Sequence, residues 1–255
     1  MSIYSETMGD GPSLVLAHGF GGSARNFRPQ ARALAARFRV TLVDLPGHAR
    51  SSAPDEPALY TLPALRQAFA EVAFRFEDPV VGGLSLGAAV ALDLALAEPR
   101  RVRALVLASY PSSGEEPGRH AWATGFADAI EAHGLDAAGA EFAWGTRSRF
   151  DPKGAELIRQ GFLEHPPHGL AHILRQTLAD LPSVATLAPR LRALDVPTLV
   201  IAGEQDGESL PPCRALAEVL RRAELRVIER AGHVVNLAQP AAFNAALGAF
   251  LSRLV

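Results

Sequence analysis

The stretch from Val80 to Ala91 constrains the fold of this chain more than any other. A short run of β-branched residues leads into the pattern G-L-S-L-G at residues 83–87, and an alanine-rich run follows. This order predicts a buried strand, a sharp turn with Ser85 at its apex, and a helix. Such a turn strains the serine backbone and brings it close to its neighbours, so glycines are needed on either side. The turn would lift the Ser85 hydroxyl above the sheet, where a substrate can reach it.

Short apolar runs recur before and after this stretch, and most of them are followed by a helical pattern. Continuous runs of this kind are typical of strands that are buried on both faces of a parallel sheet. The runs lie at residues 13–17, 38–44, 102–108, 197–203 and 225–229, with a short edge strand expected at residues 3–4. The alternation of strand and helix predicts an α/β fold with a doubly wound, mostly parallel sheet.

The alternation is interrupted between Ser112 and about Pro189, where no convincing buried strand is found. A helical excursion between two strands of one sheet usually forms a lid over the strand ends. We therefore expect one core domain built from residues 1–111 and 190–255, with residues 112–189 inserted as a helical lid. Within the insertion, helical patterns lie at residues 121–133, 155–162 and 169–178.

The insertion is rich in aromatic residues and holds both tryptophans of the chain. Aromatic side chains in such a segment either form the core of the lid helices or line an apolar substrate pocket. Both interpretations stay open at this point. The aromatic candidates are Trp122, Phe126, Phe142, Trp144, Phe150 and Phe162.

Composition narrows the class of protein. The formal net charge of −2 gives no electrostatic reason to expect nucleic acid or an anionic membrane surface as a partner. The single cysteine, Cys213, excludes an internal disulfide framework and a cysteine-rich metal site, and we expect it to be buried. The N-terminus lacks the features of a signal peptide, and no apolar run is long enough to cross a bilayer. We therefore expect a cytoplasmic protein, of open oligomeric state, without membrane or nucleic-acid partners.

A serine hydroxyl is a weak nucleophile near pH 7 and needs a base that is oriented by a carboxylate. Asp206 follows the strand expected at residues 197–203, and His233 follows the last expected strand. The carboxyl ends of parallel strands share one edge of the sheet, so these two residues can converge with Ser85. His233 would accept the Ser85 proton and return it to the leaving group, while Asp206 would hold the imidazole. Glu204 lies in the same loop and competes with Asp206, which we favour because it lies deeper in the loop.

The negative charge that develops on the substrate oxygen needs two backbone donors that point at one position. The amide of Leu86, directly after the serine, is the first candidate. The second is the amide of Phe20 in the glycine-rich loop H-G-F-G-G at residues 18–22. Both lie at the sheet edge that carries Ser85, and the sequence thus predicts an oxyanion hole at Phe20 and Leu86.

At this point the sequence resembles the α/β-hydrolase superfamily over nearly its whole length. The resemblance rests on residues 18–22, on D-L-P-G-H-A-R-S at residues 44–51, on residues 83–87, and on the Gly203–Asp206 and Gly232-His233 loops. It implies a hydrolase with a serine nucleophile and no cofactor. In such proteins the segment at residues 44–51 is a structural turn, so Asp44 and His48 are interpreted as structural.

Several subfamilies depart from this sequence at single positions. Haloalkane dehalogenases and epoxide hydrolases use an aspartate where Ser85 stands. The pyruvate-eliminating synthase of the menaquinone pathway has an arginine where Ala89 stands, and ring-cleavage C–C hydrolases usually have asparagine where Leu84 stands. The sequence is compatible with haloperoxidase-like esterases and with enzymes similar to 3-oxoadipate enol-lactonase.

The remaining candidates are weaker. His165 and His168 are separated by two prolines and have no accompanying carboxylates or cysteines, so we expect no metal site. Arg25 and Arg50 lie near the mouth of the expected site, where either could meet a substrate carboxylate. We expect a cofactor-free serine hydrolase that cleaves small to medium carboxylic esters through a Ser85 acyl-enzyme. A lactonase or C–C bond hydrolase with the same triad, and a non-catalytic ligand receptor on the same scaffold, are the alternatives.

Overall fold

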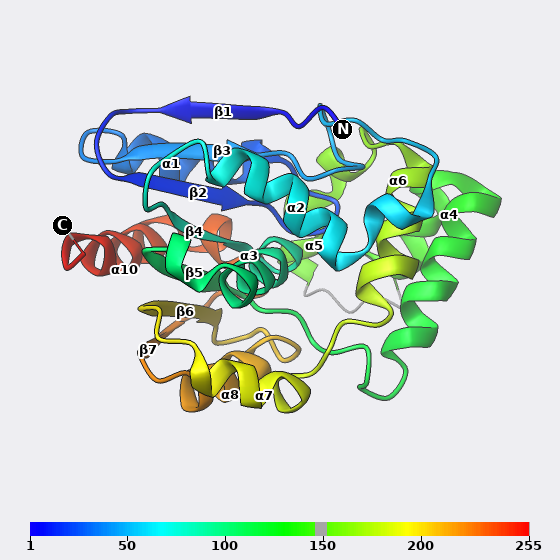
Figure 1. The fold of residues 1–255 in the computed structure, drawn as a ribbon. Helices are drawn as coiled ribbons and strands as arrows, with labels where there is room; N and C mark the ends of the chain where they lie inside the picture. Colours follow the sequence, from blue (N-terminus) through cyan, green and yellow to red (C-terminus); the bar gives the residue numbers. More distant parts are fainter. Residues whose placement is uncertain (146–151, 255) are drawn as a thin grey trace.

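A single twisted sheet runs through the centre of the molecule, which the computed structural model describes for residues 1–145 and 152–254 (Figure 1). The strand order is β1-β3-β2-β4-β5-β6-β7; β1 pairs antiparallel with β3 and every other neighbouring pair is parallel. The expected doubly wound, mostly parallel sheet is confirmed. The strands are β1 (Ser5–Met8), β2 (Ser13–Ala17), β3 (Arg39–Val43), β4 (Val80–Leu84), β5 (Ala104–Ala108), β6 (Thr198–Gly203) and β7 (Ala223–Ile228).

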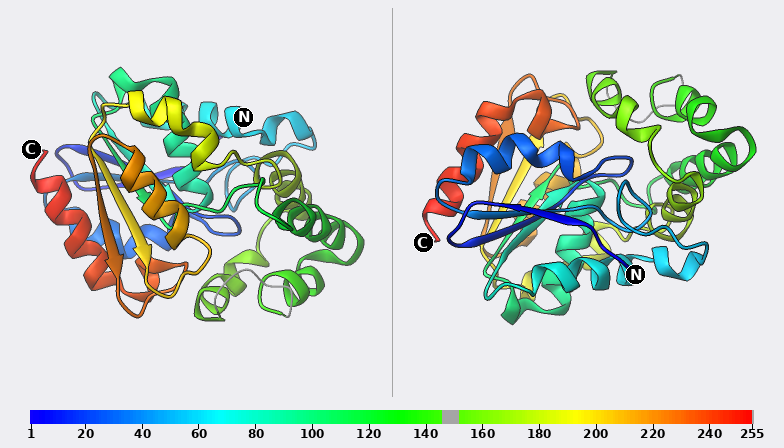
Figure 2. Two further views of the ribbon diagram at one scale, coloured as in Figure 1. Left: turned by 90° about the horizontal axis from the view of Figure 1, so that it is seen from below. Right: turned by 90° about the horizontal axis from the view of Figure 1, so that it is seen from above.

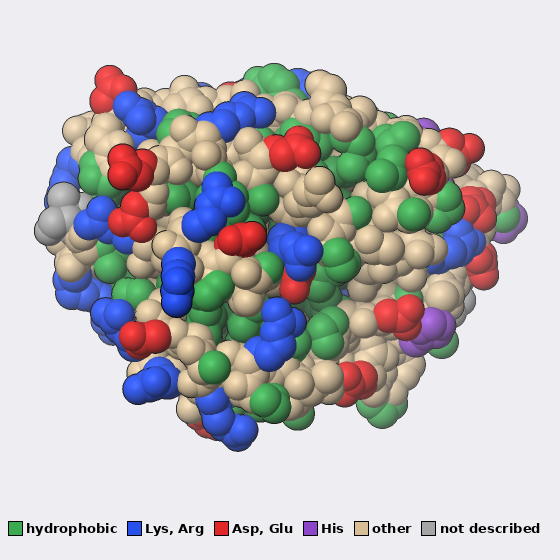
Figure 3. Space-filling view, viewed as in Figure 1, with side chains coloured by type: hydrophobic (Ala, Val, Ile, Leu, Met, Phe, Trp, Pro, Cys, Tyr) green, Lys and Arg blue, Asp and Glu red, His purple; other side chains and the backbone are tan. Residues whose placement is uncertain are grey.

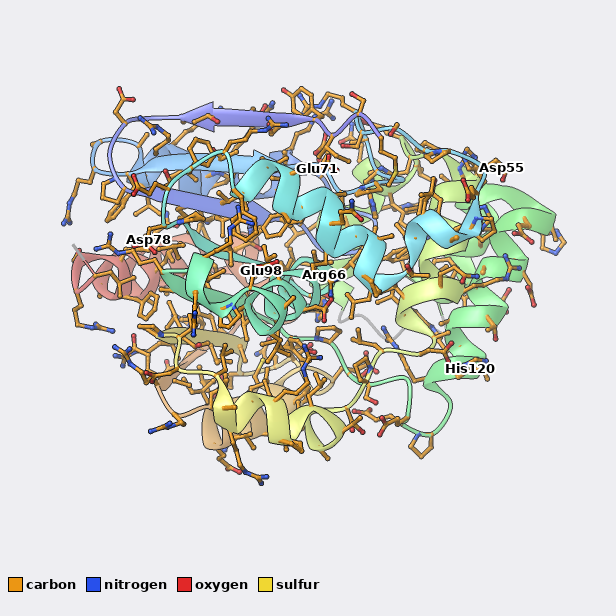
Figure 4. All side chains as sticks on the ribbon, in the orientation of Figure 1. Asp55, Arg66, Glu71, Asp78, Glu98 and His120 are labelled. Atoms are coloured by element: carbon orange, nitrogen blue, oxygen red, sulfur yellow. The ribbon has the colours of Figure 1, made fainter. Side chains whose placement is uncertain are left out.

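Helices cover both faces of this sheet, as Figure 2 shows from two sides. Helices α1 and α10 pack against each other on one face, and α2, α3, α7 and α8 cover the other. On α2, Arg66 points toward α3, where its Nη1 lies 3.0 Å from Asp93 Oδ2 (Figure 4). The helices are α1 (Arg28–Leu34), α2 (Leu62–Ala73), α3 (Leu86–Ala97), α7 (Val184–Ala193), α8 (Leu210–Val219), α9 (Val235–Ala238) and α10 (Pro240–Ser252).

Alternation of side chains along the strands explains why two cores form. In β2, Leu14 and Leu16 belong to the core beneath α1 and α10, while Val15 and Ala17 belong to the core beneath α2 and α3. Successive side chains of a strand point to opposite faces, so a strand without polar residues supplies both cores. The continuous apolar runs in the sequence are therefore the direct cause of the three-layer arrangement.

The chain between β5 and α7 leaves the sheet and folds as helices beside the carboxyl ends of the parallel strands (Figures 1 and 2). Its helix α4 bends at Gly134, whose φ of 78° and ψ of 174° interrupt the helical backbone. His120 near the start of α4 faces Asp180, with Nδ1 3.1 Å from Oδ1 (Figure 4). These helices are α4 (Arg119–Phe142), α5 (Pro152–Phe162), α6 (Pro167–Ile173) and a π-helical turn at Leu174–Leu178.

Three hydrogen bonds tie this helical segment to the loop that follows β3. The Ala49 amide donates to His165 Nδ1 at 2.9 Å, and the Thr177 hydroxyl donates to the Tyr60 carbonyl at 2.6 Å. His168 Nε2 lies 2.7 Å from the Ala53 carbonyl oxygen. The helices are thus anchored to the core through residues far away in the sequence.

The surface carries charges of both signs, and in Figure 3 the basic and acidic side chains are interspersed over the visible face. Several of them form exposed ion pairs, such as Arg175 with Asp128 and Glu131. Among the described residues, no helix is both long and apolar enough to cross a membrane.

Candidate active site

The turn between β4 and α3 holds Ser85 in a strained backbone conformation. Its φ is 52° and its ψ is −112°, a backbone region that residues other than glycine rarely adopt. The glycines on either side are required by close contact: a Cβ on Gly83 or Gly87 would lie 2.4 or 2.2 Å from the Ala17 carbonyl oxygen. The sequence therefore fixes this elbow through the glycines, and the elbow places Ser85 at the carboxyl edge of the sheet.

His233 and Asp206 form a pair at the same edge. His233 Nδ1 donates to Asp206 Oδ2 at 3.0 Å, and the Asp206 side chain is only 5% exposed. Burial alone would raise the pKa of Asp206, but the charge and hydrogen bond of His233, together with bonds from Ser209, lower it below its ordinary value. An ionised Asp206 fixes the Nδ1–H tautomer of His233, in which Nε2 is the basic nitrogen of the ring.

Glu204 lies in the same loop and does not face His233. Its Oε2 accepts a hydrogen bond from the Arg230 amide at 3.1 Å, and the residue is exposed. Ser209, which the sequence did not suggest, does touch the pair: its amide donates to Asp206 Oδ1 at 3.2 Å, and its hydroxyl lies 3.1 Å from His233 Nδ1. Its position just before the first residue of α8 was the only available signal.

Ser85 and His233 line two cavities together, and Phe20 lines both of them. The first cavity is also lined by Leu84, Ile158 and Val234. The second is also lined by residues of α4 and of the loop before α8. The structure thus brings the predicted nucleophile and base together at the walls of both cavities.

Of the two predicted oxyanion donors, Phe20 lines both cavities and Leu86 directly follows Ser85 in the chain. Phe20 lies in the loop of residues 18–22, called the oxyanion loop below, and Leu86 is the first residue of α3. Among the described residues, neither amide has a hydrogen-bond acceptor, whereas the adjacent Gly21 and Gly22 amides do. A Cβ on Gly19 would lie 3.3 Å from Ser85 Cβ, which shows how closely the loop approaches the serine. The assignment of both amides to an oxyanion hole stays a prediction.

Three buried histidines support the oxyanion loop from behind. His48 Nε2 accepts from the Gly21 amide at 3.1 Å, and His18 Nε2 accepts from the Leu45 amide at 3.0 Å. The His48 ring lies between the other two, 4.6 Å from His18 and 5.1 Å from His165, measured between ring centroids. Burial lowers the pKa of all three, and lowers that of His18 to about 4 against the opposing charge of Asp44. These rings act as neutral acceptors, and a proton on Nε2 of His18 or His48 would remove the bond to the loop backbone.

This row of histidines predicts a loss of stability in acid. The unfolded chain takes up a proton on His18 below about pH 6.5, whereas the native protein excludes it until about pH 4. Stability that is fully present above pH 6.5 should therefore fall as the pH drops toward 4, by on the order of 3 kcal/mol for His18 alone. Urea unfolding at a series of pH values measures this slope. His18→Gln should flatten it, His133→Gln on the exposed face of α4 should not, and equal slopes in both variants would contradict the assignment.

The predicted aromatic pocket is only partly formed. Trp122 lines the cavity beside Ser85. Phe126, in contrast, stacks on Phe142 and Phe162 with ring centroids 5.1 and 5.8 Å apart, and all three are buried. Trp144 is half-buried and packs edge-on against Phe162. Phe150 lies outside the described residues. These aromatic side chains mainly build the core of the helical segment, and Trp122 is the one that reaches a cavity beside Ser85.

The histidine pair at residues 165 and 168 is engaged with the backbone of the loop after β3, as described above. In the described parts of the chain, no group of three or more histidine, cysteine or acidic residues is arranged to hold a metal ion. Arg25 forms an exposed ion pair with Glu164, with Nη1 2.8 Å from Oε2, and Arg50 contacts Asp44, with Nε 3.2 Å from Oδ2. Cys213 is buried, which raises the pKa of its thiol to about 12.

Sheet order, serine elbow and helical insertion together are the architecture of an α/β hydrolase. Residues 14–246 match the profile of the Alpha/beta hydrolase family, and the chain belongs to this family. The family expected from the sequence is thereby confirmed, and the protein is a hydrolase.

Known proteins of similar sequence and structure include esterases, together with putative carbamate hydrolases and an enol-lactonase. The chain is 30% identical to a pimeloyl-[acyl-carrier protein] methyl ester esterase of Nitrosospira multiformis, over 95% of each chain. It is 34% identical to the esterase of the same name from Aeromonas hydrophila, over 95% of this chain and 96% of that one. A thermophilic esterase from Thermogutta terrifontis, solved with malate bound, superposes with a TM-score of 0.87 at 27% identity, over 99% of this chain and 93% of that one.

Proposed function

We propose that the protein is a serine hydrolase that cleaves small to medium carboxylic esters through an acyl-enzyme on Ser85. The observation that carries the proposal is the His233–Asp206 pair, 3.0 Å from Nδ1 to Oδ2, at the cavities that Ser85 lines. A base with a fixed tautomer beside an elbow serine is the arrangement that activates a hydroxyl. The esterase names of its relatives support the ester as substrate.

The steps follow from the geometry. Ser85 Oγ attacks the ester carbonyl while His233 Nε2 takes its proton, and Asp206 stabilises the imidazolium that results. The amides of Phe20 and Leu86 donate to the negative oxygen of the tetrahedral intermediate. His233 then protonates the leaving alcohol. A water molecule, deprotonated by His233, attacks the acyl group and releases the acid and free Ser85. None of these steps calls on a metal or a cofactor.

The insertion at residues 112–189 would serve as the lid over this site. It supplies walls to both cavities: Ile158 to the first, and Trp122 and Leu178 to the second. Specificity would then come from the lid, because Ala88 and Ala89 after the serine carry no polar side chain.

A substrate panel tests the proposal. We expect p-nitrophenyl esters of short acyl chains to be turned over faster than lactones of similar size or vinylogous diketo acids, and a fluorophosphonate to label the native protein. Turnover of diketo acids alone would instead identify a C–C bond hydrolase with the same triad. A protein that neither turns over esters nor takes the label would be a ligand receptor, and the proposal would be wrong.

A further inference from the structure

The two cavities beside Ser85 differ in chemistry. The first is lined by backbone and apolar side chains, and Asn26 is its only polar side chain among the described residues apart from Ser85 and His233. The second, called the polar cavity below, brings several polar groups to the same serine. Besides Ser85, His233 and Phe20, it is lined by Pro111, Ser112, Arg119, Trp122, Leu178, Glu208 and Ser209. Of the two cavities, as far as the described residues show, it is the one that contains an arginine.

Arg119 supplies that cation from inside the protein. It is the first residue of α4, it is only 6% exposed, and its guanidinium carbon lies 4.6 Å from the centre of the Trp122 ring. Nη1 lies 3.7 Å from Glu208 Oε2, within ion-pair distance. A guanidinium is costly to bury, and its planar fork of donors matches a carboxylate. A role in binding an anionic group in this cavity, which also reaches Ser85, would account for the cost of burying Arg119.

Ser112 provides an independent sign of a ligand. Its side chain is 1% exposed and lines the same cavity, yet its Oγ has no hydrogen-bond partner among the described residues. Buried hydroxyls are nearly always satisfied, and one that is not needs an explanation. A carboxylate oxygen held by Arg119 would also accept a hydrogen bond from the Ser112 hydroxyl.

We propose that the polar cavity binds a free carboxylate, so that the preferred substrates are esters that carry a second, unesterified carboxyl group close to the ester bond. This rests on the function proposed above and names its substrate class. Arg119 and Ser112 would hold the free carboxylate while Ser85 attacks the ester carbonyl. The Glu208 side chain, 26% exposed, would turn toward solvent as the substrate carboxylate takes its place beside Arg119.

The first test compares charged and neutral esters of one size. Monomethyl glutarate carries its free carboxylate on the acyl part, and O-acetylglycolate carries it on the leaving group; dimethyl glutarate and O-acetylglycolamide are their neutral counterparts. We expect kcat/KM for at least one of the charged esters to exceed that for its neutral counterpart by about 10- to 100-fold, mainly through KM. Whichever pair shows the preference identifies the part of the ester that enters the polar cavity.

Four variants locate the preference. Arg119→Gln should reduce the charged-to-neutral ratio of kcat/KM about 10- to 100-fold, and Ser112→Ala should reduce it less. Glu208→Gln should increase the ratio, because it removes the carboxylate that competes for Arg119. Arg226→Gln is the matched control, since this exposed arginine pairs with Glu224 outside the polar cavity, and its ratio should equal that of the native protein.

The outcomes separate this proposal from the one it rests on. If the native protein hydrolyses the neutral esters but shows no preference for either charged ester, the carboxylate site is wrong and the esterase stands. The same holds if Arg226→Gln changes the ratio as much as Arg119→Gln does. Should Arg119→Gln fail to fold, unchanged ratios in both Ser112→Ala and Glu208→Gln would overturn the site. Failure to hydrolyse any of the four esters would instead overturn the proposed function.

Discussion

Replacing Ser85 with alanine should lower kcat for p-nitrophenyl butyrate by on the order of 10⁶-fold while leaving the fold intact. The side chain supplies the attacking oxygen, and alanine has nothing to put in its place. The residual rate would come from substrate binding and from the Phe20 and Leu86 amides, which the substitution does not touch. Steady-state kinetics measures the loss, and circular dichroism checks the fold.

A control serine makes this result specific. Ser252→Ala, at the exposed end of α10, removes a hydroxyl that bonds only to the Gly248 carbonyl and should keep full activity. Fluorophosphonate labelling should disappear in Ser85→Ala and persist in Ser252→Ala. Ester turnover by Ser85→Ala near the native rate would mean that another residue is the nucleophile.

Asp206→Asn should lower kcat by on the order of 10⁴-fold with little change in shape. The amide of asparagine can donate to His233 Nδ1, which would stabilise the wrong tautomer and occupy Nε2 with the proton. It also loses the negative charge that stabilises the imidazolium. The pKa of Asp206 is held below its ordinary value, so its carboxylate supports His233 throughout the neutral range and is protonated only in strong acid.

Glu204→Gln is the matched control, because it makes the same chemical change two residues away in the same loop. Glu204 accepts a hydrogen bond from the Arg230 amide at the surface and does not face His233. We expect kcat to stay within about twofold of native, as is usual for an exposed side chain that takes no part in the chemistry. A greater loss in Glu204→Gln than in Asp206→Asn would make Glu204 the partner of the histidine.

Local sequence patterns predicted the sheet and the elbow because both depend on neighbours in the chain. Apolar runs make buried strands, and the pattern of Gly83, Ser85 and Gly87 between such a run and a helical run indicates a sharp strand-to-helix turn. Ser85, Asp206 and His233 could also be predicted, because residues that follow parallel strands lie at the same edge of the sheet. These predictions needed only the order of elements and no knowledge of distant contacts.

Other features of the site depend on contacts that no local pattern records. Arg119 lies outside the helical pattern expected at residues 121–133 and belongs to no motif, and only the fold shows that it is buried beside Trp122 in a cavity wall. The aromatic residues of the insertion could equally have been pocket or core, because both environments favour the same side chains. Stacking of Phe126 between Phe142 and Phe162 decides that question for these three.

The attachment of the helical insertion has a mechanical consequence. His165 Nδ1 accepts a hydrogen bond from the Ala49 amide, and its ring lies against that of His48, whose Nε2 accepts one from the Gly21 amide of the oxyanion loop. Two rings thus connect the insertion to the backbone beside Phe20. If the Phe20 amide binds the substrate oxygen as proposed, changes in the insertion near His165 should alter kcat as well as KM.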